Sequence, residues 1–430
     1  MSTKHFLIIC ILFPGFTGIF AQKLQEWDLD SCWKRAVEAH PLSGDAVLIR
    51  SSTALKVRSL SSAFLPAVEL GAQATYQSDV VSIDLDLGLP GVEFPAPTRD
   101  QYRVYLDLHQ TIYDGGSVRL QKELEQARAG AETGQTRVSL HQVRQMVSEV
   151  YFMILLLQEQ EKVLMLSDTL LQERIRLARS AVENGVLTTT DFLDLQAEQY
   201  SLRQEMEEVR FNLLSARGVL AELLGVEEES IGALRLLRAE VDPESPVRRP
   251  ELDLMDARLE GLEKTSLLLK TRLRPKLVAF GQAGYGRPGL NMLSDEFDPY
   301  FMVGARLSWN IFDGYRTRME RQRVRVEADR LTLQQETFTE QVQRDLIRQR
   351  NEAEKYRHLL DTDREILALR QELTRSAASR LGQGVITSAE YLLVWHAEKT
   401  ARIREKTHRV MLARTIAEML LTLGMEKEKP

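Results

Sequence analysis

The sequence predicts a mainly helical, internally duplicated protein with a small β part suited to a membrane. Three observations predict this fold class. Two segments of about 70 residues keep the period of a helix, and four segments of about ten to twelve residues alternate apolar with polar side chains. A glycine turn also recurs, because Gly384 follows Gly185 by 199 residues. Each half is therefore expected to hold one β-hairpin and one long helical hairpin.

Composition excludes two classes of protein. The 430-residue chain carries 56 Lys and Arg against 62 Asp and Glu, so no basic footprint points to a nucleic-acid partner. After the N-terminus no apolar run approaches the roughly 18 residues of a membrane-spanning helix. A polytopic helical membrane protein is therefore excluded.

The N-terminus predicts export. Residues 1–21 have the basic start, the apolar run and the small final residue, Ala21, of a signal peptide. Cys10 lies too early, and lacks a preceding small residue, for a lipoprotein signal. The exported chain then keeps only Cys32, so it has no intramolecular disulfide. Cys32 lies on the apolar face of a predicted helix, where a buried and inert thiol is expected.

The first repeat spans 22–225 and begins with two helices that end at prolines. The β-hairpin 66–113 follows, with alternation over 67–76 and 102–113. Its apolar positions are Val68, Leu70, Ala72, Ala74 and Tyr76 on the first strand and Val104, Leu106, Leu108 and Ile112 on the second. The helical hairpin 114–225 completes the repeat, because helical periodicity continues on both sides of the turn at Gly185.

The second repeat spans 250–424, after a connector over 226–249 that is rich in proline and acidic residues. It holds a helix, a β-hairpin over 275–312 and a helical hairpin over 313–424, and a tail over 425–430 follows. Within its β-hairpin we expect strands over 276–285 and 301–311. The β-hairpin is ten residues shorter than the first, and loop tips tolerate such differences.

Four strands of this length suit a transmembrane β-barrel, and aromatic residues lie near their ends. Four strands cannot close, and an open edge in lipid leaves backbone groups unpaired. Several subunits must therefore share one barrel, and three copies would supply twelve strands. The alternative is a soluble, half-buried hairpin, which export, duplication and the adjoining long helices disfavour.

The order of several short motifs, most of them present twice, resembles the TolC-type outer-membrane efflux protein family over the whole mature chain. The motifs are Trp27-Asp28-Leu29-Asp30 through Ala36, Ala39 and Pro41-Leu42; Leu65-Pro66; Tyr113-Asp114-Gly115-Gly116 and Phe312-Asp313-Gly314; the two glycine turns; and Leu224-Gly225 and Leu423-Gly424. The resemblance implies a homotrimer in which a twelve-stranded barrel in the outer membrane continues into a helical periplasmic tunnel. It also implies docking of a periplasmic adaptor, the membrane fusion protein, that is coupled to an inner-membrane pump.

The two glycine turns, the helical tips, hold the candidate sites. By the resemblance, the tips dock the adaptor. The docking candidates are Asn184, Gly185, Val186, Leu187 and Thr188 in the first tip and Gly384, Val385, Ile386 and Thr387 in the second.

Acidic residues near the tips are candidates for a constriction. Glu390 falls where the family places its first acidic residue, whereas Leu393 occupies the place of the second. The first tip offers Asp191 and Asp194 instead. Crowded carboxylates in a narrow mouth would favour cations. The alternative is that Asp191 and Glu390 stabilise the N-terminus of a helix.

The long helices differ at one equivalent position. Residues 150–157 are eight consecutive apolar residues, and the equivalent segment 349–356 is nearly all polar. We expect the first segment to be packed on several sides and the second to be more solvated.

No pattern in the sequence predicts an enzyme. The histidines are scattered without zinc-ligand spacing, and the glycines around Gly284 lie in a strand without the spacing of a dinucleotide loop. No cofactor or metal is expected. The sequence therefore favours a passive exit duct for tripartite efflux or type I secretion, and the alternative is a periplasmic coiled-coil scaffold or adaptor without a pore.

Overall fold

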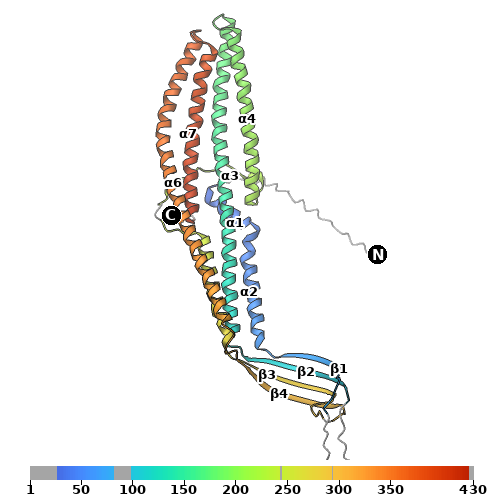
Figure 1. Ribbon diagram of the computed structural model, residues 1–430. Helices are drawn as coiled ribbons and strands as arrows, with labels where there is room; N and C mark the ends of the chain where they lie inside the picture. Colours follow the sequence, from blue (N-terminus) through green and yellow to red (C-terminus); the bar gives the residue numbers. More distant parts are fainter. Residues whose placement is uncertain (1–26, 82–97, 243–244, 293, 426–430) are drawn as a thin grey trace, which may run out of the picture. The chain divides into compact units, whose positions relative to one another are not determined.

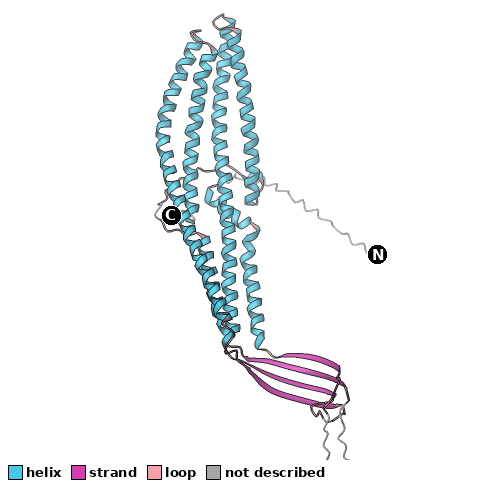
Figure 2. Ribbon diagram, viewed as in Figure 1, coloured by secondary structure: helices cyan, strands magenta, loops and turns pink. Residues whose placement is uncertain are grey.

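The computed structural model describes residues 27–81, 98–242, 245–292 and 294–425. The predicted signal peptide and most of the loop of the first β-hairpin lie outside these ranges. Figure 1 labels the strands and every helix named below except α5, and Figure 2 distinguishes the helices from the sheet. The helices are α1 (Leu29–Ala39), α2 (Asp45–Ser61), α3 (Ser117–Glu183), α4 (Thr189–Leu224), α5 (Pro250–Lys270), α6 (Arg316–Gly382) and α7 (Ser388–Leu423).

The predicted offset between the long helices is confirmed. Helices α3 and α6 begin and end 199 residues apart, and so do α4 and α7. The chain nevertheless divides into compact units that each draw on both halves. Unit 1 contains 147–239 and 356–414 together with α1 up to Ala36, and unit 2 contains 37–146, 240–355 and the end of α7. The duplication is therefore one of sequence and of elements, and the two repeats are not two separate cores.

The four strands form one antiparallel sheet in unit 2, in the order β1-β2-β3-β4. They are β1 (Ala67–Tyr76), β2 (Asp100–Tyr113), β3 (Lys276–Arg287) and β4 (Asp298–Ser308). The prediction that the last strand reaches residue 311 is wrong. Strand β3 starts at Lys276, which is paired with Ser308, so later residues have no backbone partner there. The Trp309 indole N–H instead donates to the Leu273 carbonyl at 3.0 Å.

The apolar segment of α3 is packed as expected. In 150–157 only Met153 is exposed, and Tyr151 and Ile154 are fully buried. In the equivalent segment of α6, residues 350–355 are mostly exposed and only Ala353 is buried. The expected asymmetry between the two long helices is therefore confirmed.

The predicted connector is more ordered than its composition indicated. Within it, Ile231 and Leu234 are buried, and Leu234 forms a parallel bridge with Trp27. The Tyr151 hydroxyl lies 2.5 Å from the Arg235 carbonyl and 3.2 Å from the Trp27 carbonyl. A single buried phenol on α3 therefore holds both the start of the described chain and the connector.

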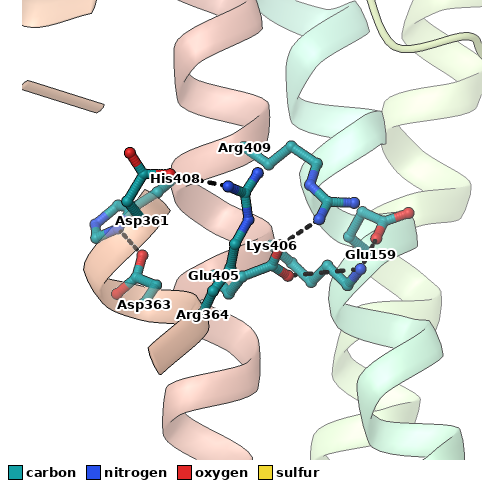
Figure 3. A network of polar contacts seen from close by, with 8 residues as sticks. All are labelled: Glu159, Asp361, Asp363, Arg364, Glu405, Lys406, His408 and Arg409. Atoms are coloured by element: carbon teal, nitrogen blue, oxygen red, sulfur yellow. Dashed lines mark hydrogen bonds and ion pairs between the residues drawn. The ribbon is translucent and has the colours of Figure 1, made fainter. Parts of the chain in front are cut away.

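A network of charged side chains joins α3, α6 and α7 in unit 1, as Figure 3 shows. Lys406 of α7 lies 3.5 Å from Glu405 and 3.7 Å from Glu159 of α3. His408 Nδ1 of α7 lies 2.5 Å from a carboxylate oxygen of Asp363 on α6. Glu405 and Asp363 are buried, so removal of one partner would leave an uncompensated buried charge. The network therefore favours one register of the three helices.

In unit 2, two glycines of α3 face the short helix α5. A Cβ at Gly134 would lie 3.1 Å from the Leu254 Cα, whereas a Cβ at Gly130 would lie 3.8 Å from the Ala257 Cβ. Helix α3 continues through both positions. The absence of a side chain at Gly134 therefore allows α3 and α5 to approach closely.

His141 of α3 is buried next to an ion pair between Arg249 and Glu251. Burial and then the Arg249 charge lower the pKa of His141 to about 4. Its Nε2 atom has no hydrogen-bond partner among the parts of the chain that the structure describes. His141 is therefore a neutral core residue at pH 7.

Cys32 is fully buried in α1, and burial together with the Asp28 charge raises the pKa of its thiol to about 12. The prediction of a buried thiol is confirmed, and the high pKa makes it unreactive.

Among the helices of the described residues, none combines the length and the apolar character required to cross a membrane.

Candidate functional site

Both tips use the same backbone geometry to end a long helix. Gly185 has φ of 74° and Gly384 has φ of 68°, a left-handed conformation that glycine adopts without strain. The N–H of Gly185 donates to Val182, and the N–H of the next residue reaches back five residues, to Ala181. The second tip repeats this pair of bonds. These are Schellman turns, which satisfy the last carbonyls of α3 and α6.

The helix that follows each tip begins with a capping box. In the first tip, Thr188 and Asp191 exchange bonds: the Asp191 N–H donates to the threonine hydroxyl at 3.2 Å, and the Thr188 N–H donates to the carboxylate at 3.1 Å. In the second tip, Thr387 and Glu390 form the same pair at 3.3 and 2.9 Å. The capping alternative weighed for Asp191 and Glu390 is thus a contact that the structure contains.

The first tip also binds the second. The Ser388 N–H donates to Asp191 at 2.8 Å, and the Ser388 hydroxyl lies 2.9 Å from an Asp194 carboxylate oxygen. Asp191 is only 9% exposed. Burial by itself raises the pKa of Asp191, but hydrogen bonds donated by Ser388 and Thr188 outweigh it and lower the pKa to about 2. Asp191 is therefore an ionised carboxylate that caps α4 and also receives the first backbone N–H of α7.

The three acidic candidates thus occupy different surroundings. Asp191 and Asp194 meet at Ser388, whereas Glu390 is exposed and bonds only within its own tip. Ser388 was not among the candidates from the sequence, although it is fully buried. One feature of the sequence could have pointed to this contact: the first tip carries two acidic residues, Asp191 and Asp194, whereas the second tip carries only Glu390.

Most of the docking candidates are accessible. Exposed residues of the first tip are Asn184, Gly185, Val186 and Thr188, and those of the second are Gly384, Val385 and Thr387, with Ile386 half-buried. Leu187 differs, because it is buried in the core cluster of unit 1 and supports the tip from inside. A cavity of about 290 Å³ lies beside the first tip, between Leu177 and Ala181 of α3 and Leu381 of α6.

The sheet has one apolar and one polar face. The register places Val68, Leu108, Gly281 and Val303 in one row across the four strands, and Leu70, Leu106, Ala283 and Phe301 in the next such row. The opposite face carries a row of Glu69, Asp107, Gln282 and Met302, in which Gln282 donates to Asp107 at 2.8 Å. The alternation predicted from sequence therefore continues across all four strands.

On β2, exposure of the two faces is the reverse of that in a soluble sheet. On β2 the apolar-face residues from Tyr102 to Leu108 are exposed, and the polar-face residues from Gln101 to Asp107 are buried or half-buried. Val303 of β4 is 77% exposed. Contiguous apolar surface of this kind marks contact with lipid or with another protein.

In the described parts of the chain, no group of three or more His, Cys, Asp or Glu side chains is arranged to hold a metal ion. The chemistry available at the tips is hydrogen bonding and charge, and that of the sheet is the separation of an apolar from a polar surface. The tips can therefore bind a partner through hydrogen bonds and charge, and the sheet can separate an apolar from a polar environment.

Three solved structures share this fold over nearly their whole length. A membrane protein from Pseudomonas aeruginosa has a TM-score of 0.70 and 17% identity, covering 92% of this chain and 90% of its own. The outer membrane protein VceC from Vibrio cholerae has a TM-score of 0.68 and 14% identity, with 92% and 94% covered. The CmeC outer membrane channel of Campylobacter jejuni has a TM-score of 0.67 and 15% identity, with 93% and 87% covered. Among curated protein sequences, none matches the chain.

The fold, a four-stranded sheet joined to paired long helices, is therefore shared with solved bacterial membrane proteins. The model of the outer membrane efflux protein family matches residues 46–226 of this chain. The resemblance to this family inferred from the sequence is thereby confirmed over those residues.

Proposed function

We propose that this protein is the passive exit duct of an efflux or secretion system, with a pore through the outer membrane. The observation that carries the proposal is the exposed apolar face of the sheet, together with the inverted exposure on β2, whose polar-face residues from Gln101 to Asp107 are buried or half-buried. In lipid, an apolar outer face and a polar inner face are the arrangement of a transmembrane β-barrel. The duct does no chemistry, and transport energy comes from its partners.

The barrel of this duct is shared by three copies of the chain. Among the described residues, the outer edges of β1 and β4 pair with no other strand. The order of the antiparallel sheet gives these two strands opposite directions, so β4 of one copy can pair in antiparallel fashion with β1 of the next. Closure removes every open edge, which lipid would otherwise penalise by several kcal/mol per unpaired group. Three copies give twelve strands.

The tips form the periplasmic end of the duct and dock the adaptor, itself coupled to an inner-membrane pump. Support comes from the exposed tip residues, above all Val186 and Val385, which are 46% and 60% exposed. The acidic residues nearest the tips, Asp191, Asp194 and Glu390, are the candidates for a constriction. Glu390 is the accessible one, and Asp191 also holds the two tips together.

The competing function, a periplasmic scaffold without a pore, makes a different prediction for adjacent residues on β1. Leu70 faces the apolar side and is 72% exposed, and Glu69 is exposed on the polar side. Arginine on the lipid face of a barrel costs about 2–4 kcal/mol at the membrane midplane. In a soluble scaffold both positions would tolerate arginine equally.

The test compares Leu70→Arg with Glu69→Arg in outer-membrane fractions. A duct predicts heat-modifiable trimers and channels in planar lipid bilayers for the wild type and Glu69→Arg, and loss of both for Leu70→Arg. A soluble monomer in periplasmic extract, or equal behaviour of the two variants, would reject the duct.

A further inference from the structure

The polar face of the sheet carries a row in which glycine and tyrosine alternate. The register pairs Gly71 of β1 with Tyr105 of β2, Tyr105 with Gly284 of β3, and Gly284 with Tyr300 of β4. Gly71 is near the middle of β1, and Tyr300 is the third residue of β4. The two glycine–tyrosine pairs come from the two β-hairpins, one from each repeat.

Each tyrosine ring lies across the neighbouring strand, over the glycine with which it is paired. A Cβ added at Gly71 would be 2.6 Å from two ring carbons of Tyr105, and a Cβ at Gly284 would be 2.6 Å from the Tyr300 Cζ. Real Cβ atoms do not approach so closely, so the ring and a side chain at the glycine exclude one another. Both rings turn toward the preceding strand.

A second row on the same face repeats the arrangement with phenylalanine. Phe280 of β3 is paired with Gly304 of β4, and a Cβ at Gly304 would lie 2.6 Å from the Phe280 Cζ. The Arg306 guanidinium lies 5.4 Å from the centre of this ring. Aromatic rings of the polar face therefore lie directly over Gly71, Gly284 and Gly304.

We propose that Tyr105 and Tyr300 form a collar that sets the width of the pore in the barrel, and that Gly71 and Gly284 keep the collar open by letting both rings lie on the wall. The collar rests on the proposed duct, because the polar face lines the pore only in a closed barrel. Glu69 and Gln73, the neighbours of Gly71 on the same face of β1, lie in the adjoining rows on either side of the Tyr105 ring. A ring displaced from its glycine therefore turns away from the wall, into the pore.

Alanine at the two glycines tests the collar, and a third glycine supplies the control. Gly281 lies on the apolar face of β3, and a Cβ there would make ordinary contacts at 3.6 Å and beyond. The probe is a graded series of polyethylene glycols added to single channels in planar bilayers from the side of the sheet. The largest polymer that enters from this side reports the width of the barrel. The measurement does not depend on the tips, because in the proposed duct a polymer meets the barrel first.

We expect the Gly71→Ala/Gly284→Ala variant to admit only smaller polymers than the wild type, and Gly281→Ala to leave the size limit unchanged. Tyr105→Ala/Tyr300→Ala should raise the limit, also when combined with the two glycine substitutions. Intact heat-modifiable trimers establish that each variant has assembled.

An unchanged size limit in assembled Gly71→Ala/Gly284→Ala channels would overturn the collar. If that variant does not assemble, the tyrosine variant decides, and an unchanged limit there overturns the collar as well. A wild-type protein that forms no channel is a different result, because it overturns the duct and the collar with it.

Discussion

The bond from Ser388 to Asp191 predicts that a single carboxylate links the two tips. Replacing Asp191 by Asn keeps the size of the side chain but removes its charge. The variant should weaken the bond that the carboxylate accepts from the Thr188 N–H at the start of α4 and the bond from the first N–H of α7, because the acceptor in both is ionised. The local effect should therefore appear in both tips, although the substitution is in only one.

The magnitude follows from the pKa. The pKa of Asp191 falls from its ordinary value of 3.8 to about 2. That difference corresponds to about 2 kcal/mol, which screening by nearby solvent reduces to about 1 kcal/mol. The folded pKa lies below the unfolded one, so this stabilisation is present above about pH 4 and is lost as the pH falls toward 2.

Amide hydrogen exchange at Ser388 is the assay, because that N–H is itself the donor. A loss of about 1 kcal/mol should speed its exchange about fivefold in Asp191→Asn at pH 7. Glu390→Gln is the matched control, since Glu390 caps α7 within its own tip and is exposed. It should leave the amides of the first tip unchanged. Equal exchange at Ser388 in the wild type and Asp191→Asn would refute the linkage.

Three further predictions concern the long helices and their turns. The pKa of His141, lowered to about 4, lies below that of the unfolded chain, so acidification from pH 7 to 5 should cost about 2 kcal/mol, and a His141→Leu variant should lose that pH dependence in thermal unfolding. Gly130→Ala should raise the free energy of unfolding by about 0.5–1 kcal/mol, because alanine has the higher helix propensity. Gly134→Ala should give no such gain, because its Cβ would meet the backbone of α5, and denaturant titration of the two variants compares them. Alanine at Gly185 or Gly384 should destabilise its tip by about 1 kcal/mol, because each glycine has a positive φ. Gly384→Ala should destabilise more, because a carbonyl of the first tip would lie 2.9 Å from the new Cβ, and hydrogen exchange at the tips compares the two variants.

Much of the fold is local in origin, which explains why the sequence predicted it. The ends of α3 and α4 follow from helical periodicity and from the glycine and threonine of the tip, all within a few residues of each other. The same holds for β1, whose alternation between Pro66 and Tyr76 is uninterrupted. The end of β4 was predicted wrongly, because a strand ends where its partner ends, and that partner, Lys276, is 32 residues away.

The candidate site was predictable in part. The tips and their acids were visible in the sequence, because the turn recurs 199 residues on. The role of Asp191 was not decided, since a capping acid and a constricting acid have the same local pattern. The contact with Ser388, 197 residues away, places this carboxylate between the two tips.

The sequence by itself determined the helices, the alternating strands, the duplication and the resemblance to a family, because each depends on spacing along the chain. Only the tertiary structure decided which side chains meet across those elements. Tyr105 lies over Gly71 because the register of two strands pairs them, and a shift of one residue would turn the row to the other face. The register is fixed by packing over the whole sheet, and the bond between the tips joins residues 197 apart. Neither contact can therefore be predicted from a local stretch of sequence.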